Sequence, residues 1–87
     1  MSARVVMYRT RFCGYCLRAE WLLRRKGVAF DSIDVGGDQP RRAWLREATG
    51  QHTVPQLFID GQSIGGYTEL AALDESGELD RRLGLLR

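Results

Sequence analysis

Residues 5–27, VVMYRTRFCGYCLRAEWLLRRKG, decide the fold that this sequence predicts. They begin with the apolar run from Val5 to Tyr8, which lacks helical periodicity and is typical of a buried strand. From Tyr15 to Lys26 apolar residues recur among charged ones, and Gly27 follows the basic last turn as a C-cap. The stretch therefore predicts a strand that leads into a helix, with two cysteines at the junction.

The residues that follow extend this pair into an α/β fold. Val28 to Val35 predicts a second strand, which completes a βαβ unit with a right-handed crossover. Asp38 and Pro40 are typical of a helix cap and first turn, and Gly50 ends that second helix.

The C-terminal half predicts a hairpin and a last helix. Leu57 to Ile59 and Gln62 to Ile64 flank Asp60-Gly61, a pair that favours a type I′ turn. Thr68 is expected to cap a helix that carries Leu70, Ala71 and Leu73 and extends past Gly77 to Leu79 and Leu83. The predicted order is β-α-β-α-β-β-α, and residues 1–87 are expected to form a single domain.

Length and composition limit the possible functions. A chain of 87 residues is too short for a catalytic barrel, and 44% hydrophobic with 28% charged residues is ordinary for a globular domain. The net charge of +2 is spread over scattered residues, so no nucleic-acid partner is expected. Arginines interrupt the N-terminus and no apolar run approaches about 20 residues, so we expect a cytoplasmic protein without membrane contact.

The two cysteines, Cys13 and Cys16, are too close in sequence to staple a fold, so their purpose is expected to be chemical. A thiol at a helix N-terminus faces unpaired backbone N–H groups and the positive end of the helix dipole, which favour the thiolate. Arg9 and Arg11 add positive charge nearby. Cys16, one turn further into the helix, is close enough to form a disulfide. The pair predicts a redox site in which Cys13 attacks and Cys16 resolves.

Other interpretations of these residues are weaker. Free cysteines often serve as small apolar packing residues, but the position after a strand in a βαβ unit favours redox chemistry. A structural zinc site needs four ligands, and His52 is the only further candidate, so no metal site is expected. As a general base His52 lacks an orienting carboxylate, and a solvent-facing loop histidine is the simpler interpretation.

Three further features leave alternatives open. Pro55 either starts a strand or follows a cis bond, which would free the Val54 backbone to pair with a peptide-like ligand. Gly65-Gly66 either forms a plain turn or lets an anionic ligand approach the next helix N-terminus. Trp21 and Trp44 lie on predicted apolar helix faces and are expected in the core.

Together these residues resemble the glutaredoxins, most closely the short bacterial dithiol type. The resemblance runs from about Val5 to Leu83 and rests on Cys13-Gly14-Tyr15-Cys16, Thr53-Val54-Pro55, Phe58-Ile59-Asp60-Gly61 and Ile64-Gly65-Gly66-Tyr67-Thr68-Glu69-Leu70. It implies a thioredoxin fold, with a four-stranded mixed sheet and helices on both faces. It also implies an enzyme that uses glutathione to reduce protein–glutathione mixed disulfides and some protein disulfides.

The resemblance assigns roles residue by residue. Cys13 corresponds to the nucleophile and Cys16 to the resolving thiol, with Tyr15 shaping the site beside them. In the loop formed by Thr53, Val54 and Pro55, the valine backbone would pair with the cysteinyl part of glutathione.

The ends of glutathione would be held by other groups. Gly66, Thr68 and Glu69 match the helix start that holds the γ-glutamyl carboxylate and ammonium. Arg42 and His52 occupy positions that help to hold the glycine carboxylate in relatives.

Three positions depart from the family pattern. Gly14 stands where proline is usual, and some relatives with Gly or Ser there bind a [2Fe–2S] cluster between two subunits. Thr10 replaces a family lysine, so Arg9 or Arg11 would have to supply its charge. Glu69 replaces the usual aspartate.

The leading hypothesis is a monomeric, glutathione-dependent thiol–disulfide oxidoreductase whose partners are glutathione and glutathionylated or disulfide-containing proteins. The alternative is a dimer that holds a [2Fe–2S] cluster through two Cys13 thiolates and two glutathiones and acts as a cluster carrier or redox sensor. A thioredoxin-like protein served by a reductase is a third hypothesis, which the Gly66 to Glu69 segment disfavours.

Overall fold

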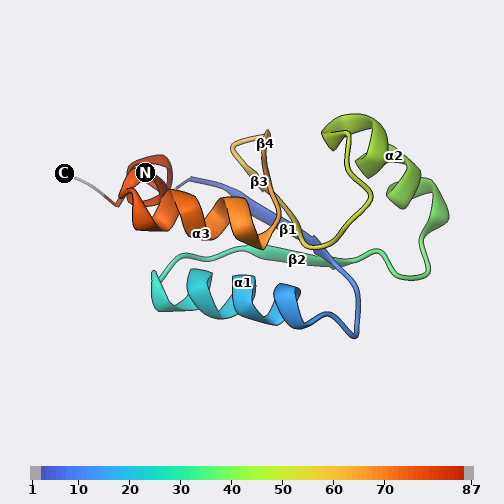
Figure 1. Cartoon of the computed structure of the whole chain (residues 1–87), viewed down its shortest axis with the longest axis horizontal. Helices are drawn as coiled ribbons and strands as arrows, with labels where there is room; N and C mark the ends of the chain where they lie inside the picture. The colour runs from blue at the N-terminus through green and yellow to red at the C-terminus, as the bar shows by residue number, and fades with distance from the viewer. Residues whose placement is uncertain (1–2, 86–87) are drawn as a thin grey trace.

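The computed structural model describes residues 3–85 of the chain (Figure 1). Its helices and strands are, in chain order, β1 (Val5–Arg9), α1 (Gly14–Arg25), β2 (Asp31–Asp34), α2 (Gln39–Thr49), β3 (Gln56–Ile59), β4 (Gln62–Gly65), α3 (Tyr67–Glu75) and α4 (Glu78–Arg82). The sheet has the strand order β2-β1-β3-β4, in which β1 pairs with β2 in parallel and with β3 antiparallel. The sheet is therefore mixed, as predicted.

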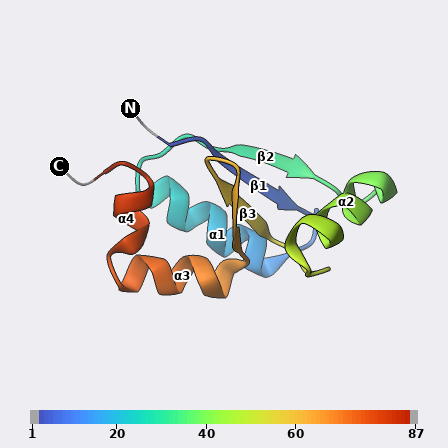
Figure 2. The ribbon, with the colours of Figure 1, turned by 90° about the horizontal axis from the view of Figure 1, so that it is seen from above.

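Helices cover both faces of this sheet. Alternate residues of a strand point to opposite faces, and one face of β1 and β3 packs against α1, α3 and α4. This core cluster contains Val5, Met7, Ala19, Leu22, Leu23, Leu57, Ile59, Leu70, Leu79 and Leu83. On the other face Trp44 of α2 packs on Tyr8 and Phe58, with ring centroids 5.5 and 5.7 Å away. Figure 2 shows α1 and α3 running alongside each other, as expected for the thioredoxin fold.

The expected caps and turns of the central segment are confirmed. The Asp38 side chain accepts a hydrogen bond from the Arg41 backbone N–H at 3.0 Å, which begins α2, and Gly50 ends it with φ 71°. Asp60 and Gly61 have φ values of 52° and 80° between β3 and β4. Both residues at the tip of the hairpin thus have the positive φ that a type I′ turn requires.

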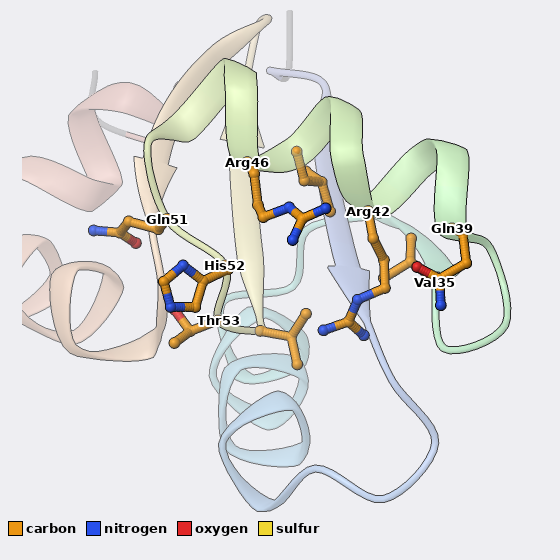
Figure 3. A pocket seen from close by; sticks show the side chains of 9 residues that line it. Val35, Gln39, Arg42, Arg46, Gln51, His52 and Thr53 are labelled. Atoms are coloured by element: carbon orange, nitrogen blue, oxygen red, sulfur yellow. The ribbon is translucent and has the colours of Figure 1, made fainter.

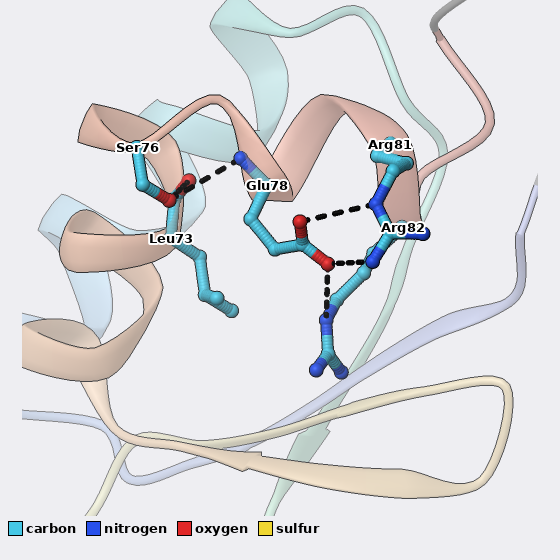
Figure 4. Close-up of polar contacts among 5 residues, drawn as sticks. All are labelled: Leu73, Ser76, Glu78, Arg81 and Arg82. Carbon is cyan, nitrogen blue, oxygen red and sulfur yellow. Dashed lines mark hydrogen bonds and ion pairs between the residues drawn. The ribbon is translucent and has the colours of Figure 1, made fainter.

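The C-terminal helix that the sequence predicts is divided in two. Gly77 adopts φ 82° between α3 and α4, a conformation that favours glycine. Figure 4 shows the junction, where the Ser76 hydroxyl donates to the Leu73 carbonyl oxygen at 3.0 Å and accepts from the Glu78 N–H at 3.3 Å. The Glu78 carboxylate bonds to the Arg81 guanidinium, which lowers the pKa of Glu78 and raises that of Arg81.

Three other local predictions were wrong. β2 begins at Asp31 rather than Val28, because the preceding residues pack against the core without pairing in the sheet. Gly66, not Thr68, is the N-cap of α3, since the chain turns directly out of β4. Trp21 is 62% exposed and Trp44 45% exposed, so neither is a core residue.

The C-terminal end of α1 is fixed by ion pairs. The Lys26 ammonium lies 2.5 Å from an Asp74 carboxylate oxygen and 2.8 Å from an Asp80 oxygen. Hydrogen bonds to these two carboxylates raise the pKa of Lys26. Lys26 therefore connects α1 to α3 and α4 through one side chain.

The two outer strands leave their edges open. Among residues 3–85, β2 and β4 each pair with one neighbouring strand, and Asp31 and Asp34 are exposed on β2. Within residues 3–85, no helix has the length and apolar character needed to cross a membrane.

Candidate active site

The two cysteines lie at the N-terminus of α1 in different environments. Cys13 is the N-cap, with extended backbone angles (φ −137°, ψ 108°), and its Sγ accepts a hydrogen bond from the Cys16 backbone N–H at 3.1 Å. Both thiols are free; Cys13 is half-buried, whereas Cys16 is only 2% exposed. An incoming sulfur can therefore approach Cys13 and not Cys16.

The environment of Cys16 opposes its ionisation. Burial, followed by the hydrogen bond with Cys13, raises the pKa of Cys16 to about 12. A buried thiol far below its pKa is a poor nucleophile, because the thiolate is the reactive form. This geometry supports the predicted division of roles, with Cys13 as the attacking sulfur.

The loop before β3 meets Cys13 directly. The Val54–Pro55 peptide bond is cis, which was the second of the two possibilities for Pro55. The Cys13 thiol donates a hydrogen bond to the Val54 carbonyl oxygen at 3.7 Å. Thr53, Val54 and Pro55 are thus brought beside the cysteine pair, as the resemblance implied.

Sequence reasoning missed Gln56, a fully buried polar side chain that supports this loop. Its Nε2 donates to the Gln51 side-chain oxygen at 2.9 Å and to the Thr53 carbonyl oxygen at 3.0 Å. A glutamine in an otherwise apolar strand pattern is the signal that could have found it, since a buried amide needs hydrogen-bond partners.

A hollow lies between α1, the 51–55 loop and α3. Its lining includes most of the predicted glutathione-site residues, and the whole set is Tyr15, Gln51, Thr53, Val54, Pro55, Gly66, Tyr67, Thr68 and Glu69. The rings of Tyr15 and Tyr67 have centroids 6.1 Å apart. The N-termini of α1 and α3 lie at the same end of the molecule (Figure 1), so both helix dipoles direct their positive ends toward this region.

The turn into α3 leaves no room for larger residues. Gly65 has φ 111°, and a Cβ there would lie 2.6 Å from an oxygen of the Glu69 carboxylate. The Glu69 side chain folds back over this turn, where it accepts a hydrogen bond from the Gly66 N–H at 3.2 Å. A Cβ on Gly66 would lie 3.2 Å from the Pro55 carbonyl oxygen. The paired glycines therefore allow the turn and the cis-proline loop to approach closely.

A cationic hollow adjoins the first one. It is lined by Val35, Gln39, Arg42, Leu45, Arg46, Gln51, His52, Thr53 and Val54. Figure 3 shows the Arg42 and Arg46 side chains reaching from α2 toward the loop that carries His52. Within residues 3–85 neither arginine forms an ion pair. Arg46 was not predicted, although its position four residues after Arg42 places both on one helix face.

Not every predicted residue joins these hollows. Arg11 is exposed and lines a separate depression with Asp34 and Asp38, so it remains a sequence-based prediction. His52 does line the cationic hollow, and it is exposed on its loop as predicted. Among the residues that the structure describes, no three His, Cys, Asp or Glu side chains gather as a metal site.

The chain matches the family model "Glutaredoxin" over residues 5–64. It is 45% identical to Glutaredoxin 3 of Escherichia coli K12 over 78 residues, which cover 90% of this chain and 94% of that protein. It is 46% identical to a glutaredoxin of Pseudomonas aeruginosa over 79 residues, covering 91% and 94%. A crystal structure of a buckwheat glutaredoxin–glutathione complex superposes with a TM-score of 0.89 at 30% identity, covering 94% of this chain and 77% of that one. The sequence motif, the fold and these similarities agree: the chain belongs to the glutaredoxin family of thiol–disulfide oxidoreductases.

Proposed function

We propose that this glutaredoxin uses glutathione to reduce protein–glutathione mixed disulfides, with Cys13 as the nucleophile and Cys16 as the resolving thiol. The observation that carries the proposal is the contrast between the two thiols beside the hollow. Cys13 is accessible there, whereas Cys16 is 2% exposed with a pKa of about 12. One accessible sulfur is what exchange with a single glutathione requires.

The hollow suits a bound glutathionyl group. Within residues 3–85 the Val54 N–H makes no backbone hydrogen bond, and its carbonyl oxygen faces Cys13, so both can pair with a cysteinyl residue. The start of α3 offers backbone N–H groups to the γ-glutamyl carboxylate. Arg42 and His52 supply positive charge and a polar contact for the glycine carboxylate. The glutathione complex of the buckwheat relative supports this choice of ligand.

The reaction proceeds through two exchanges. The Cys13 thiolate attacks the glutathione sulfur, a Cys13–glutathione disulfide forms, and the substrate thiolate leaves and takes up a proton. The thiolate of a second glutathione then attacks the glutathione sulfur of this adduct. Oxidised glutathione is released, and Cys13 returns as a thiolate.

Cys16 takes part in the reduction of protein disulfides. When Cys13 is joined to a substrate protein, Cys16 loses its proton and attacks the Cys13 sulfur, which forms the Cys13–Cys16 disulfide and releases the substrate thiol. Burial, the largest cause of the raised pKa of Cys16, opposes the loss of its proton in this step.

Turnover of a glutathionylated protein with glutathione tests the proposal. Cys13→Ser should abolish turnover, and Cys16→Ser should retain most of it and accumulate a Cys13–glutathione adduct visible by mass spectrometry. Replacing glutathione with 2-mercaptoethanol should slow the wild type strongly. Equal loss in both variants would contradict the assigned roles.

A [2Fe–2S]-bridged dimer is the second candidate, and Gly14 favours it. Gly14 is exposed with no atom within 4 Å of a Cβ position, so nothing crowds the approach to Cys13 at this point. Because Cys16 is buried, one chain offers one thiolate, and two chains with two glutathiones would complete four ligands.

Anaerobic purification followed by iron analysis and a visible spectrum tests this candidate. A brown dimer that forms only with glutathione, and that Gly14→Pro abolishes, would support it. A colourless monomer after reconstitution with iron, sulfide and glutathione would exclude it.

A further inference from the structure

Helix α1 exposes a row of large apolar side chains that the fold does not use. Leu17 is 66% exposed and Trp21 62% exposed, and their spacing of four residues places them on one helix face. Phe12, which directly precedes Cys13, is 95% exposed. We call Phe12, Leu17 and Trp21 the α1 ridge. Exposed large apolar side chains such as Leu17 and Trp21, one helical turn apart, typically mark an interaction surface.

Phe12 remains exposed although the sequence offers it a partner. With Cys13 as N-cap, Phe12 and Leu17 occupy the two positions that pack together in a hydrophobic staple. Both side chains are instead exposed, so the staple is not formed. Each is therefore free to contact another molecule without breaking an internal contact.

The ridge is separate from the proposed glutathione site. None of its residues lines the hollow beside Cys13, whose α1 contribution is Tyr15. At about 1.5 Å per helical residue, Leu17 lies about 6 Å and Trp21 about 12 Å along the helix from Cys13. That distance equals about four extended residues of a substrate chain whose cysteine is joined to the glutathione sulfur in front of Cys13.

Positive charge surrounds the ridge. Within residues 3–85 neither Arg11 nor Arg18 has a carboxylate within 4.0 Å, so both are available to a partner. The Arg25 guanidinium lies 4.8 Å from the centroid of the Trp21 ring. The one acidic residue of α1, Glu20, is engaged by Arg24.

This charge decides which occupant fits. A second copy docked ridge to ridge would bring Arg11 and Arg18 near arginines of the other copy, and like charges at an interface disfavour association. A partner with acidic side chains gains instead from the same arginines. Because the ridge begins at Cys13, that partner must also present a sulfur to be exchanged.

We propose that the α1 ridge docks the segment that flanks the modified cysteine of a glutathionylated protein, and that it favours segments with apolar and acidic side chains. The inference rests on the proposed function and adds a substrate preference to it. Cys13 attacks the glutathione sulfur at the hollow, the substrate sulfur leaves from the far side of that sulfur, and the flanking substrate segment reaches back along α1.

Three glutathionylated peptides and one small mixed disulfide test the preference. The peptides carry Leu and Glu, Leu and Lys, or only Ser within four residues of the cysteine, and the small substrate is glutathione joined to 2-mercaptoethanol. The wild type should turn over the Leu/Glu peptide with a kcat/KM about tenfold above that of the Leu/Lys peptide. The Ser peptide should resemble the small substrate.

Removal of the apolar ridge should affect only the peptide substrates. The double variant Leu17→Ser/Trp21→Ser should lower kcat/KM for the Leu/Glu peptide several-fold and leave the small substrate unchanged. Leu85→Ser, at another leucine that is 41% exposed, is the matched control and should change neither.

A charge reversal tests the arginines. Arg18→Glu should shift the Glu-to-Lys preference toward the Lys peptide by about tenfold, whereas Arg82→Glu on α4 should not. Arg18 also lies 5.7 Å from the Tyr15 ring, but the peptides carry the same glutathionyl group, so their ratio cancels any effect there.

Three other results would contradict either the inference or the proposed function on which it rests. Equal kcat/KM for all three peptides would overturn the docking role and leave the proposed function intact, whereas no turnover of any glutathionylated substrate would overturn the proposed function. A wild-type dimer that the double variant dissociates would identify a second copy as the occupant and overturn the inference.

Discussion

The two ends of helix α1 are stabilised in opposite ways. At the C-terminal end the Lys26 ammonium binds Asp74 and Asp80, and Asp74 also meets Arg25 at 3.7 Å. At the N-terminal end Cys13 is half-buried, and Phe12 is exposed. One end has its charges paired within the fold, and the other leaves its functional groups available.

This contrast shows how a small domain can hold a reactive site in place. The helix is one rigid element, so anchoring its far end limits the movement of the end that carries Cys13. Cys13 makes two hydrogen bonds within the fold but is only half-buried, so its sulfur can still meet a substrate. The contacts that hold α1 in place are therefore the ion pairs about three turns away from Cys13 and the packing of the core beneath the helix.

The largest effect is expected from Cys13→Ser, which should abolish disulfide exchange while changing the free energy of unfolding by less than about 0.5 kcal/mol. The serine hydroxyl can replace Sγ as acceptor for the Cys16 N–H, so the helix keeps its cap. Cys13→Ala should be equally inactive and about 1 kcal/mol less stable. Urea unfolding and turnover assays measure the two properties. Equal stability of the two variants would mean that the cap contributes nothing.

Lys26→Met should lower stability and leave activity unchanged, which is the reverse of the effect of Cys13→Ser. It leaves Asp80 without its cation and Asp74 with only Arg25 at 3.7 Å in a partly buried site, and we expect the free energy of unfolding to fall by about 2 kcal/mol. Turnover per folded molecule should not change. Arg4→Met, which removes an exposed pair with Asp31, is the control and should cost less than about 0.5 kcal/mol. A large loss of turnover in folded Lys26→Met would contradict the separation of the two ends.

Gln56→Met tests the loop that lies beside Cys13 at the N-terminal end of α1. It removes the two hydrogen bonds that support the 51–55 loop, so the KM for glutathione should rise several-fold while kcat changes less. Steady-state kinetics at varied glutathione concentration measure this split. An unchanged KM in a variant of normal structure would show that the loop holds its position without Gln56.

The last prediction concerns alkaline pH. Because the folded-state pKa of Cys16 is raised to about 12, the unfolded chain loses this proton first as pH rises. The stabilisation is complete below the ordinary value of 9.0 and is lost as pH approaches about 12. Cys16→Ala lacks this dependence, so its stability and that of the wild type should converge over this range. Parallel urea titrations that keep a constant difference would contradict the assignment.

The sequence predicted the features that depend on local chemistry. Asp38, Gly50 and the Asp60-Gly61 pair each act through their own backbone or side chain, and all three behave as expected. The position of Cys13 and Cys16 at the start of α1 followed from the strand–helix junction in the same way.

Features that depend on distant packing could not be predicted. Apolar residues occur on more than one side of α1. The order of apolar residues in the sequence therefore could not show that Leu22 is buried and Trp21 exposed. Gln56 is polar in sequence and buried only because the 51–55 loop folds over it. The break at Gly77 depends on how α4 packs into the core, where Leu79 is fully buried.

The charged edge of β2 has a consequence for the sheet as a whole. An open strand edge is a template for another chain, and a continuous sheet across two molecules would be the result. Asp31 and Asp34 are exposed on this edge, so two copies that approached edge to edge would bring carboxylates together. These carboxylates, of which Asp31 is partly balanced by Arg4 at 3.7 Å, therefore disfavour pairing of β2 with the β2 of another copy.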